Sequence, residues 1–272
     1  MITTLAISFV TYYPDRGVLD RIGLALESGF SVFVFDNTPG GSELFKNRVH
    51  ENVFLMGSGE NVGLGMALHR MMQAIAESGF SSVFYFDQDT LFTKATMDWF
   101  RQWLQVNETS LNAGVAIWNF TNSREILSPD TAVNQKGYLL VSSGSLFQLE
   151  VLKKLGWHNP NYFLECIDYE LCARALFAGF ALVEVGGCVG MDHVSLQPVD
   201  TLQLMGRKFT YRLYSLGRTW SFVWGLFVLG IRSFLRSQWI FGIKCLRNIA
   251  THVLIQIRAL ILRFLQVIFG GK

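Results

Sequence analysis

Apolar and polar residues alternate along the first 200 residues in a pattern that predicts stacked β-α units. Short apolar runs predict buried strands, and longer segments with apolar residues three or four positions apart predict helices. The predicted strands are 5–11, 31–35, 53–56, 82–86, 114–118 and 137–141, with a further strand end at 185–191. The predicted helices are 19–27, 65–78, 93–106, 149–155 and 168–178. This order indicates an α/β fold.

Three of the predicted strands end in polar residues. These are Thr11, the pair Asp36-Asn37, and the triplet Asp87-Gln88-Asp89. In open α/β sheets, ligands bind beyond the carboxyl ends of the strands. The pattern therefore predicts a binding site at this edge of the sheet.

Charge divides the chain into two parts. Residues 201–272 contain eleven Lys or Arg and no Asp or Glu, whereas the first 200 residues carry 12 bases against 21 acids. Such asymmetry indicates an anionic partner for the basic part, either nucleic acid or anionic lipid. The abundance of Trp, Phe, Leu, Ile and Val in the basic part favours lipid. We therefore predict a domain at 1–200 and a membrane-associating region at 201–272.

The basic region is expected to lie on a membrane rather than to cross it. The apolar segment 220–231 is too short for a bilayer, which takes about 20 residues, and Arg232 follows it. Arg236, Arg247 and Arg258 recur every eleven residues and would share one helical stripe. A basic stripe beside an apolar face is typical of interfacial helices, and Trp residues suit the headgroup region. The alternative is a set of helices packed on the first domain or in an oligomer interface.

The N-terminus and the cysteines indicate a cytoplasmic protein. The sequence MITTLAISFVTYY lacks a basic segment and a cleavage site, so it is expected to be a core strand rather than a signal peptide. The four cysteines contain no C-x-x-C pair, which argues against a zinc site or a disulfide framework and fits a reducing compartment.

Asp87 and Asp89 are the strongest candidates for metal chemistry. They follow a buried strand directly, so their carboxylates would be held in place with little flexibility. A departing nucleoside diphosphate needs a divalent cation to neutralise its charge, and Mg²⁺ takes one or two protein carboxylates besides phosphate oxygens. We therefore predict Mg²⁺ or Mn²⁺ at this pair. The alternative is a solvated turn in which Asp89-Thr90 caps the next helix.

Asp168 opens a predicted helix and is the candidate catalytic base. The positive end of the helix dipole is expected to keep its carboxylate ionised, so that it can accept a proton from a hydroxyl. The alternative is an N-cap residue followed by a Glu170–Arg174 pair worth only a few tenths of a kcal/mol.

Two further segments suggest ligand contacts. His193 would be a third metal ligand or a phosphate contact, although a lone histidine is also a common structural residue. The glycine-rich segment 57–65 does not match G-x-G-x-x-G, which excludes a dinucleotide fingerprint. Its glycines predict a tight loop beside the nucleotide.

Taken in order, these pieces resemble family 2 glycosyltransferases, in particular the rhamnosyltransferase-like branch of bacterial surface polysaccharide synthesis. The resemblance covers roughly residues 5–195. The matching segments run Val10-Thr-Tyr-Tyr-Pro14-Asp15, Phe35-Asp-Asn37, Glu60-Asn-Val-Gly63-Leu-Gly65-Met-Ala67, Phe86-Asp-Gln-Asp89-Thr90, Ser143-Gly-Ser145 and Phe163 through Arg174, and they close at His193.

The resemblance implies a GT-A fold and a role for each matching residue. The implied roles are nucleotide contacts for Thr11, Asp36, Asn61 and Gly63, diphosphate and metal contacts for Asp87 and Asp89, acceptor-cleft lining for Ser143 and Gly144, and the catalytic base for Asp168. Departures at His69, where relatives commonly have Asn, and at Glu165-Cys166 leave the sugar open.

The expected function is therefore metal-dependent, inverting transfer of rhamnose or another hexose from a nucleotide donor. The expected acceptor is a lipid-linked glycan in polysaccharide or O-antigen synthesis, at the cytoplasmic face of the inner membrane. An oligomer or an assembly complex is possible, and nucleic acid is not expected. A nucleotide-dependent oxidoreductase is disfavoured because the first strand runs into Tyr-Tyr-Pro-Asp instead of a glycine turn. A non-catalytic membrane-bound scaffold remains the alternative.

Overall fold

The computed structural model describes most of the chain and divides it into two compact units, Met1–Ser195 and Leu196–Lys272. The described residues are 4–46, 50–107, 111, 114–122, 127–132, 134–188, 191–193, 200–204 and 207–269.

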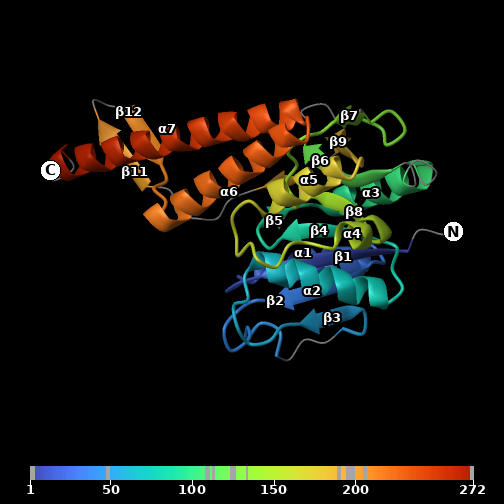
Figure 1. Ribbon diagram of the computed structural model, residues 1–272. Coiled ribbons are helices and arrows are strands. Elements are labelled where there is room, and N and C mark those ends of the chain that lie inside the picture. Colours follow the sequence, from blue (N-terminus) through green and yellow to red (C-terminus); the bar gives the residue numbers. More distant parts are fainter. Residues whose placement is uncertain are drawn as a thin grey trace. The chain divides into compact units, whose positions relative to one another are not determined.

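The first unit is a mixed sheet flanked by helices (Figure 1). Its elements are β1 (Leu5–Thr11), α1 (Gly17–Glu27), β2 (Ser31–Asp36), β3 (Val53–Met56), α2 (Leu64–Glu77), β4 (Ser82–Asp87), β5 (Thr90–Leu91), α3 (Lys94–Asn107), β6 (Val115–Asn122), β7 (Asn134–Lys136), β8 (Ser145–Gln148), α4 (Leu149–Leu155), α5 (Ile167–Phe177), β9 (Ala181–Cys188) and β10 (Asp192–His193).

The large sheet changes direction next to β4. Its described strands run in the order β3-β2-β1-β4-β8-β6-β9-β7. The first four strands are parallel, whereas β8 is antiparallel to both β4 and β6. The start of β8 therefore lies at the same edge as the carboxyl end of β4, where Ser145 is opposite Tyr85.

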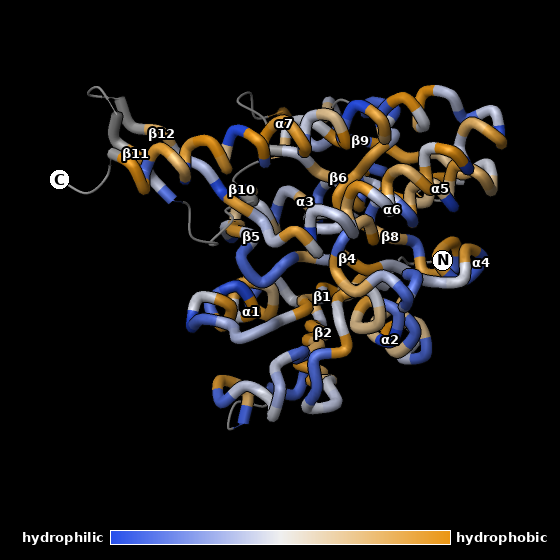
Figure 2. The backbone as a smooth tube through the Cα atoms, turned by 60° about the vertical axis from the view of Figure 1, so that its left-hand side comes forward, coloured by the Kyte–Doolittle hydropathy of each residue, from blue (hydrophilic) through white to orange (hydrophobic). Residues whose placement is uncertain are grey.

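Helices cover both faces of the sheet because each has one apolar side. Figure 2 shows α1 and α2 on opposite sides of β1 and β2. The buried residues of α1 are Val18, Arg21, Ile22 and Ala25, three or four positions apart as in an amphipathic helix. Both faces of the central strands are consequently buried, which explains continuous apolar runs such as Val83–Phe86.

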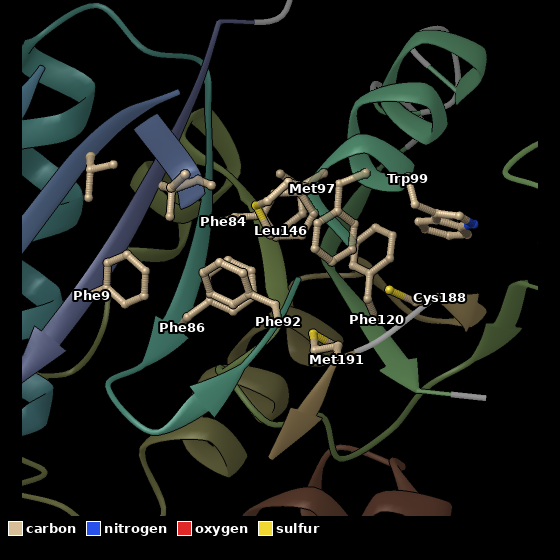
Figure 3. Close-up of a cluster of buried hydrophobic side chains, with 14 of the residues drawn as sticks. Phe9, Phe84, Phe86, Phe92, Met97, Trp99, Phe120, Leu146, Cys188 and Met191 are labelled. Atoms are coloured by element: carbon tan, nitrogen blue, oxygen red, sulfur yellow. The ribbon is translucent and has the colours of Figure 1, made fainter. Parts of the chain in front are cut away.

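An aromatic cluster fills the space between the sheet and α3 (Figure 3). Phe84 of β4 lies 4.4 Å from Phe100 of α3 and 5.1 Å from Phe120 of β6, measured between ring centroids. Phe92 and Met191, which follow β5 and precede β10, belong to the same cluster. The core therefore anchors the segments on both sides of the β5–β10 pair.

Most of the predicted elements are confirmed within a residue or two, but the region before β8 is not. The strand predicted at 137–141 is wrong. Gly137 and Leu140 form a tight bend there, since a Cβ at position 137 would lie 2.7 Å from Leu140 Cδ2. The sheet strand is instead β8, which was missed because it is only four residues long and runs directly into α4.

The second unit is a β-hairpin followed by two long helices. It contains β11 (Asp200–Leu204), β12 (Arg207–Tyr211), α6 (Leu216–Leu235) and α7 (Trp239–Phe269). Arg236 lies in the turn after α6, so the predicted stripe of three arginines is wrong, and only Arg247 and Arg258 share a helix. Of the described helices, α7 alone is long and apolar enough to be a candidate membrane span, with a mean hydropathy of 1.5.

The two helices of the second unit pack along a seam of small and apolar residues. At this seam a Cβ on Gly242 would lie 2.7 Å from Phe234 Cε1, and one on Gly230 would lie 3.5 Å from Cys245 Cβ. Further along α7, Ala259 and Leu262 pack against Leu202 and Tyr211 of the hairpin. Both helices therefore bury one side within the unit.

Close packing of the 157–166 loop on α2 gives a stability prediction. A Cβ on Gly65 would lie 2.2 Å from the carbonyl oxygen of Tyr162 and 2.7 Å from that of Asn159. Gly65→Ala is therefore expected to lower the free energy of unfolding by about 2–3 kcal/mol in urea denaturation. Gly23→Ala is the control, because that helical position has nothing within 4 Å and alanine should stabilise it by about 0.5–1 kcal/mol. Equal effects of the two substitutions would contradict the packing described here.

Candidate functional site

Strand register brings the polar strand ends together. Thr11 of β1 is opposite Asp36 of β2, and Val10 of β1 is opposite Asp87 of β4. The three polar residues predicted from their positions at strand ends therefore lie on neighbouring strands at one edge of the sheet.

Asp36 is buried, and its described contacts shape the loop that follows β2. Its Oδ1 accepts hydrogen bonds from Thr11 Oγ1 at 3.3 Å and from the Thr38 amide at 3.1 Å. Its Oδ2 accepts one from the Ser42 amide at 2.5 Å. Thr11 is fully buried behind Asp36. These hydrogen bonds hold the loop after β2 in place. The nucleotide contacts expected of Thr11 and Asp36 remain predictions.

The glycines before α2 serve packing. A Cβ on Gly63, whose φ is 80°, would lie 2.6 Å from Phe163 Cδ2, and the Leu64 amide donates to the Phe163 carbonyl at 2.7 Å. Asn61 Oδ1 accepts from the Gly63 amide at 3.0 Å. The 157–166 loop therefore approaches these glycines closely. The nucleotide contacts expected of Asn61 and Gly63 remain predictions.

Asp87 is fixed from both sides by hydroxyl groups. Its Oδ1 accepts a hydrogen bond of 2.6 Å from the Tyr85 hydroxyl, and its amide donates to Ser143 Oγ at 2.8 Å. Ser143 Oγ also lies 2.7 Å from Thr90 Oγ1. Ser143 and Gly144 are buried, and Ser143 braces the end of β4. The acceptor-cleft lining expected of both residues remains a prediction.

Asp168 is tied to the same turn by the neighbouring serine. Ser142 Oγ donates a short hydrogen bond to Asp168 Oδ1. Because Ser142 binds Asp168 and Ser143 binds the backbone of Asp87, two adjacent residues hold both acids. Asn119 supports this turn, with its Nδ2 2.9 Å from Ser145 Oγ and 3.3 Å from the Ser143 carbonyl oxygen.

Three aspartates lie near Tyr85, as their electrostatic effect on its hydroxyl group shows. Burial raises the pKa of the Tyr85 hydroxyl well above its ordinary value, and the negative charges of Asp87, Asp168 and Asp89 raise this pKa further. All three carboxylates are therefore close enough to Tyr85 to interact with it. The structure thus brings together Asp87, Asp89 and Asp168, which lie far apart in the sequence.

The environment of Asp168 differs from the one expected at a helix start. Burial raises its pKa to about 6, the charges of Asp87 and Glu165 raise it as well, and hydrogen bonds from Ser142 oppose the rise. Desolvation is therefore the largest influence on the pKa of this carboxylate. The carboxylate is still mostly ionised at pH 7, with a pKa near the value that suits a general base.

The N-terminus of α5 is also not built as the capping alternative supposes. Cys166 occupies the N-cap with φ 63°, and no side chain caps the helix there. This left-handed backbone costs on the order of 1 kcal/mol, and such strain is common at functional sites. Likewise, Asp89-Thr90 does not cap α3. Thr93 does so, since its Oγ1 accepts from the Thr96 amide at 3.3 Å.

Glu170 and Arg174 form a buried clamp, not a marginal surface pair. Arg174 binds the two Glu170 oxygens through Nε and Nη2 at 2.7 and 2.8 Å. It also donates to the carbonyl oxygens of Leu155 and Trp157, the latter at 2.7 Å. The Glu170 side chain is only 5% exposed, and removing one partner of such a pair is strongly destabilising. The clamp joins α5 to the loop that precedes it.

Two histidines link this loop to α2. His69 Nδ1 donates to the His158 carbonyl oxygen at 2.8 Å, which gives this departure from the family pattern a structural role. His158 is fully buried against Phe147, and burial, with the charges of Arg174 and His69, lowers its pKa to about 3. The His158 imidazole is therefore neutral.

Arg21 and Gln88 are site residues that the sequence analysis missed. Arg21 donates to the Gln88 carbonyl oxygen, and its pKa is lowered by burial and raised by Asp15, Asp89 and Asp20. In the sequence, the position of Arg21 among the apolar residues of α1 was the available sign that its side chain is buried. The Gln88 side chain accepts from the Tyr12 amide at 2.7 Å and donates to the Tyr12 carbonyl at 3.1 Å. It thereby extends the β1–β4 ladder.

The backbone of His193 lies beside the turn that contains Asp87 and Asp89. β10 pairs antiparallel with β5, and His193 is opposite Thr90, the residue after Asp89. Among the described residues, no three His, Cys, Asp or Glu side chains form a group that could hold a metal. A metal coordinated by Asp87, Asp89 and His193 therefore remains a prediction.

Comparison with solved structures identifies the fold. The crystal structure of S. aureus TarS 1–349 in complex with UDP-GlcNAc matches with a TM-score of 0.53 and 12% identity, over 84% of this chain and 66% of that chain. A crystal structure of TarS 1–349 matches with a TM-score of 0.50 and 12% identity, over 84% and 64%. The chain thus spans just under two thirds of these structures. No protein-family model and no curated protein matches the sequence. The GT-A fold expected from the sequence is confirmed.

The raised pKa of Asp168 predicts a pH-dependent gain of stability in Asp168→Asn. Its folded-state pKa of about 6 exceeds the ordinary value of 3.8, so its contribution to stability is greatest below pH 4 and is lost as pH rises through 6. Asp168→Asn should therefore match the wild type near pH 4 and exceed it by about 1–3 kcal/mol at pH 8, measured by urea unfolding. The control Asp98→Asn, at a half-exposed carboxylate on α3 that pairs with Lys94, should change stability by less than about 1 kcal/mol at either pH. A stability gain of Asp168→Asn that is equal at both pH values would show that the pKa of Asp168 is not raised in the folded protein.

Proposed function

We propose that the chain is a glycosyltransferase that uses a nucleoside diphosphate sugar as its donor. The observation that carries the proposal is the gathering of Asp87, Asp89 and Asp168 around Tyr85, at the carboxyl ends of the strands. Two of these acids suit a cation-bound diphosphate, and the third has the pKa of a base. The fold shared with a protein crystallised with UDP-GlcNAc supports a nucleotide-sugar donor.

The donor set fits a divalent cation that arrives with the diphosphate. Two carboxylates are the usual protein contribution to such a site when phosphate oxygens complete the coordination. Asp87 and Asp89 would hold the cation, which supplies charge neutralisation for the departing diphosphate. The local negative charge also argues for it, because the three acids would otherwise repel the phosphates.

The residues of the chain have separate roles in the proposed reaction. The Asp168 carboxylate accepts the proton of an acceptor hydroxyl while that oxygen bonds to the anomeric carbon. The bond between the anomeric carbon and the diphosphate oxygen breaks, and the diphosphate leaves with the electron pair. Attack from the face opposite the leaving group inverts the anomeric configuration. Ser142 orients Asp168, and Tyr85 orients Asp87.

The finer identity of the substrates is part of the same proposal. The donor sugar is rhamnose or another hexose, and the acceptor is a lipid-linked glycan of a surface polysaccharide. The motif resemblance supports the first, and the basic, apolar C-terminal unit supports the second. A non-catalytic scaffold would not need a base with a raised pKa beside two further acids.

Paired substitutions separate the base from the donor site. Asp168→Asn should reduce transfer by about 10²–10⁴-fold and leave binding of UDP with Mn²⁺ within a few-fold, because only the proton acceptor is lost. Asp89→Asn should instead weaken metal-dependent UDP binding. Calorimetry and sugar-release assays measure the two effects, with Asp98→Asn as a control. Loss of UDP binding in Asp168→Asn, or UDP binding that is indifferent to Mn²⁺, would contradict these roles.

The pH profile of transfer tests the same base independently. Only ionised Asp168 accepts a proton, so kcat/KM should fall about tenfold per pH unit below its pKa of about 6 and level off above it. Ser142→Ala removes a hydrogen bond that lowers this pKa and should move the acidic limb to higher pH. An acidic limb centred near pH 4 in both proteins would exclude Asp168 as the base.

A further inference from the structure

The solvent-exposed side of α6 is an apolar stripe. Its six members are three or four residues apart, which places them on one side of the helix. Their exposed fractions range from 42% to 85%. The stripe consists of Leu216, Trp220, Trp224, Phe227, Ile231 and Leu235. The Trp220 and Trp224 rings are stacked with centroids 6.0 Å apart, so two indoles form one exposed surface.

Hydrophobic residues recur along the length of α7 (Figure 2), and many of them are exposed and form a second apolar stripe. Its large residues also repeat at helical spacing, and their exposed fractions range from 46% to 66%. They are Trp239, Ile243, Leu246, Leu254, Ile257, Ile261, Phe264 and Ile268. Arg247 and Arg258 are exposed and, being eleven residues apart, share one edge of this stripe.

Packing within the C-terminal unit does not account for the stripes. Leu226, Leu229 and Ser233 of α6 are buried, as are Phe241 and Cys245 of α7, and all lie on other faces of their helices. An amphipathic helix of a soluble protein needs one apolar face. Each of these helices has a buried face and a second, exposed apolar face, and exposed apolar surface of this extent marks an interaction site.

Charge identifies the partner. Helices α6 and α7 carry six Lys or Arg and no acidic residue. Tryptophan beside apolar residues and basic edges matches the layering of a phospholipid surface, where indoles lie at the headgroups and bases meet anionic lipid. A protein partner for a surface with basic residues and no acidic ones would have to be strongly acidic.

We propose that the exposed stripes of α6 and α7 dock this chain on an anionic phospholipid bilayer, with both helices lying in the interface and neither crossing it. α7 has 31 residues and is about 46 Å long, longer than the roughly 30 Å hydrocarbon core. However, basic residues interrupt both helices, at Arg218 and Arg232 in α6 and at Lys244, Arg247, Arg258 and Arg263 in α7. Neither helix therefore has 18 consecutive uncharged residues. The periodic stripe suits a helix that is half immersed along its length.

Vesicle sedimentation with the full chain tests the lipid contact. The wild type should bind vesicles containing about one third phosphatidylglycerol and bind pure phosphatidylcholine far more weakly. Arg247→Gln/Arg258→Gln should weaken anionic binding about thirtyfold, whereas Arg70→Gln/Lys154→Gln, at exposed bases of the first unit, should not. Trp220→Ser/Trp224→Ser should weaken it at least tenfold, and Leu55→Ser/Val106→Ser, at exposed apolar residues of the first unit, should leave it unchanged. Far-ultraviolet circular dichroism confirms folding.

Alkaline carbonate extraction of the vesicle-bound chain tests its orientation. Release into the supernatant supports helices lying in the interface. Retention in the pellet would overturn the proposal in favour of a spanning helix. Stripe-dependent self-association without vesicle binding would overturn it in favour of an interface between copies of the chain. These experiments test lipid binding alone and do not depend on the proposed catalytic activity. Binding of UDP and Mn²⁺ tests the proposed function in a separate measurement.

Discussion

Three carboxylates of like charge are held near one another at the carboxyl end of β4, and this arrangement governs the rest of the site. Burial and the neighbouring acids together favour the protonated form of Asp168, as its raised pKa shows. A hydrogen bond from Ser142 offsets part of that cost at Asp168, and one from Tyr85 stabilises Asp87. Such a concentration of negative charge attracts cations and disfavours a bare diphosphate.

The sheet topology explains how distant residues reach this place. The parallel strands β1, β2 and β4 align their carboxyl ends, and the antiparallel β8 begins at that same edge. The turn before β8 therefore meets the end of β4, and its two serines contact both halves of the site. The Glu170–Arg174 clamp then holds the loop that leads into α5.

Strand-end residues were predictable because period and position are local properties of the sequence. The continuous apolar runs predicted β1, β2 and β4, and with them the placement of Asp36 and Asp87. Contacts made across the fold were not predictable in this way. Nothing local indicates that Ser142 binds Asp168 or that Gly65 faces a loop carbonyl. The raised pKa of Asp168 was not predictable for the same reason, since its main cause is burial, which is not a local property of the sequence. The C-terminal helices were placed by composition, but their break at Arg236 was not.

The pairing of β4 with β8 also orders events during synthesis. Closing a loop between segments so far apart costs entropy, and chains fold from the N-terminal side as they leave the ribosome. A nascent chain that has emerged only through β6 can form the β1-β2-β4 ladder, yet it lacks Ser142, Ser143 and the start of α5. A product truncated there would keep its first two acids without the third, so the assembled cluster marks a chain that has been translated past α5.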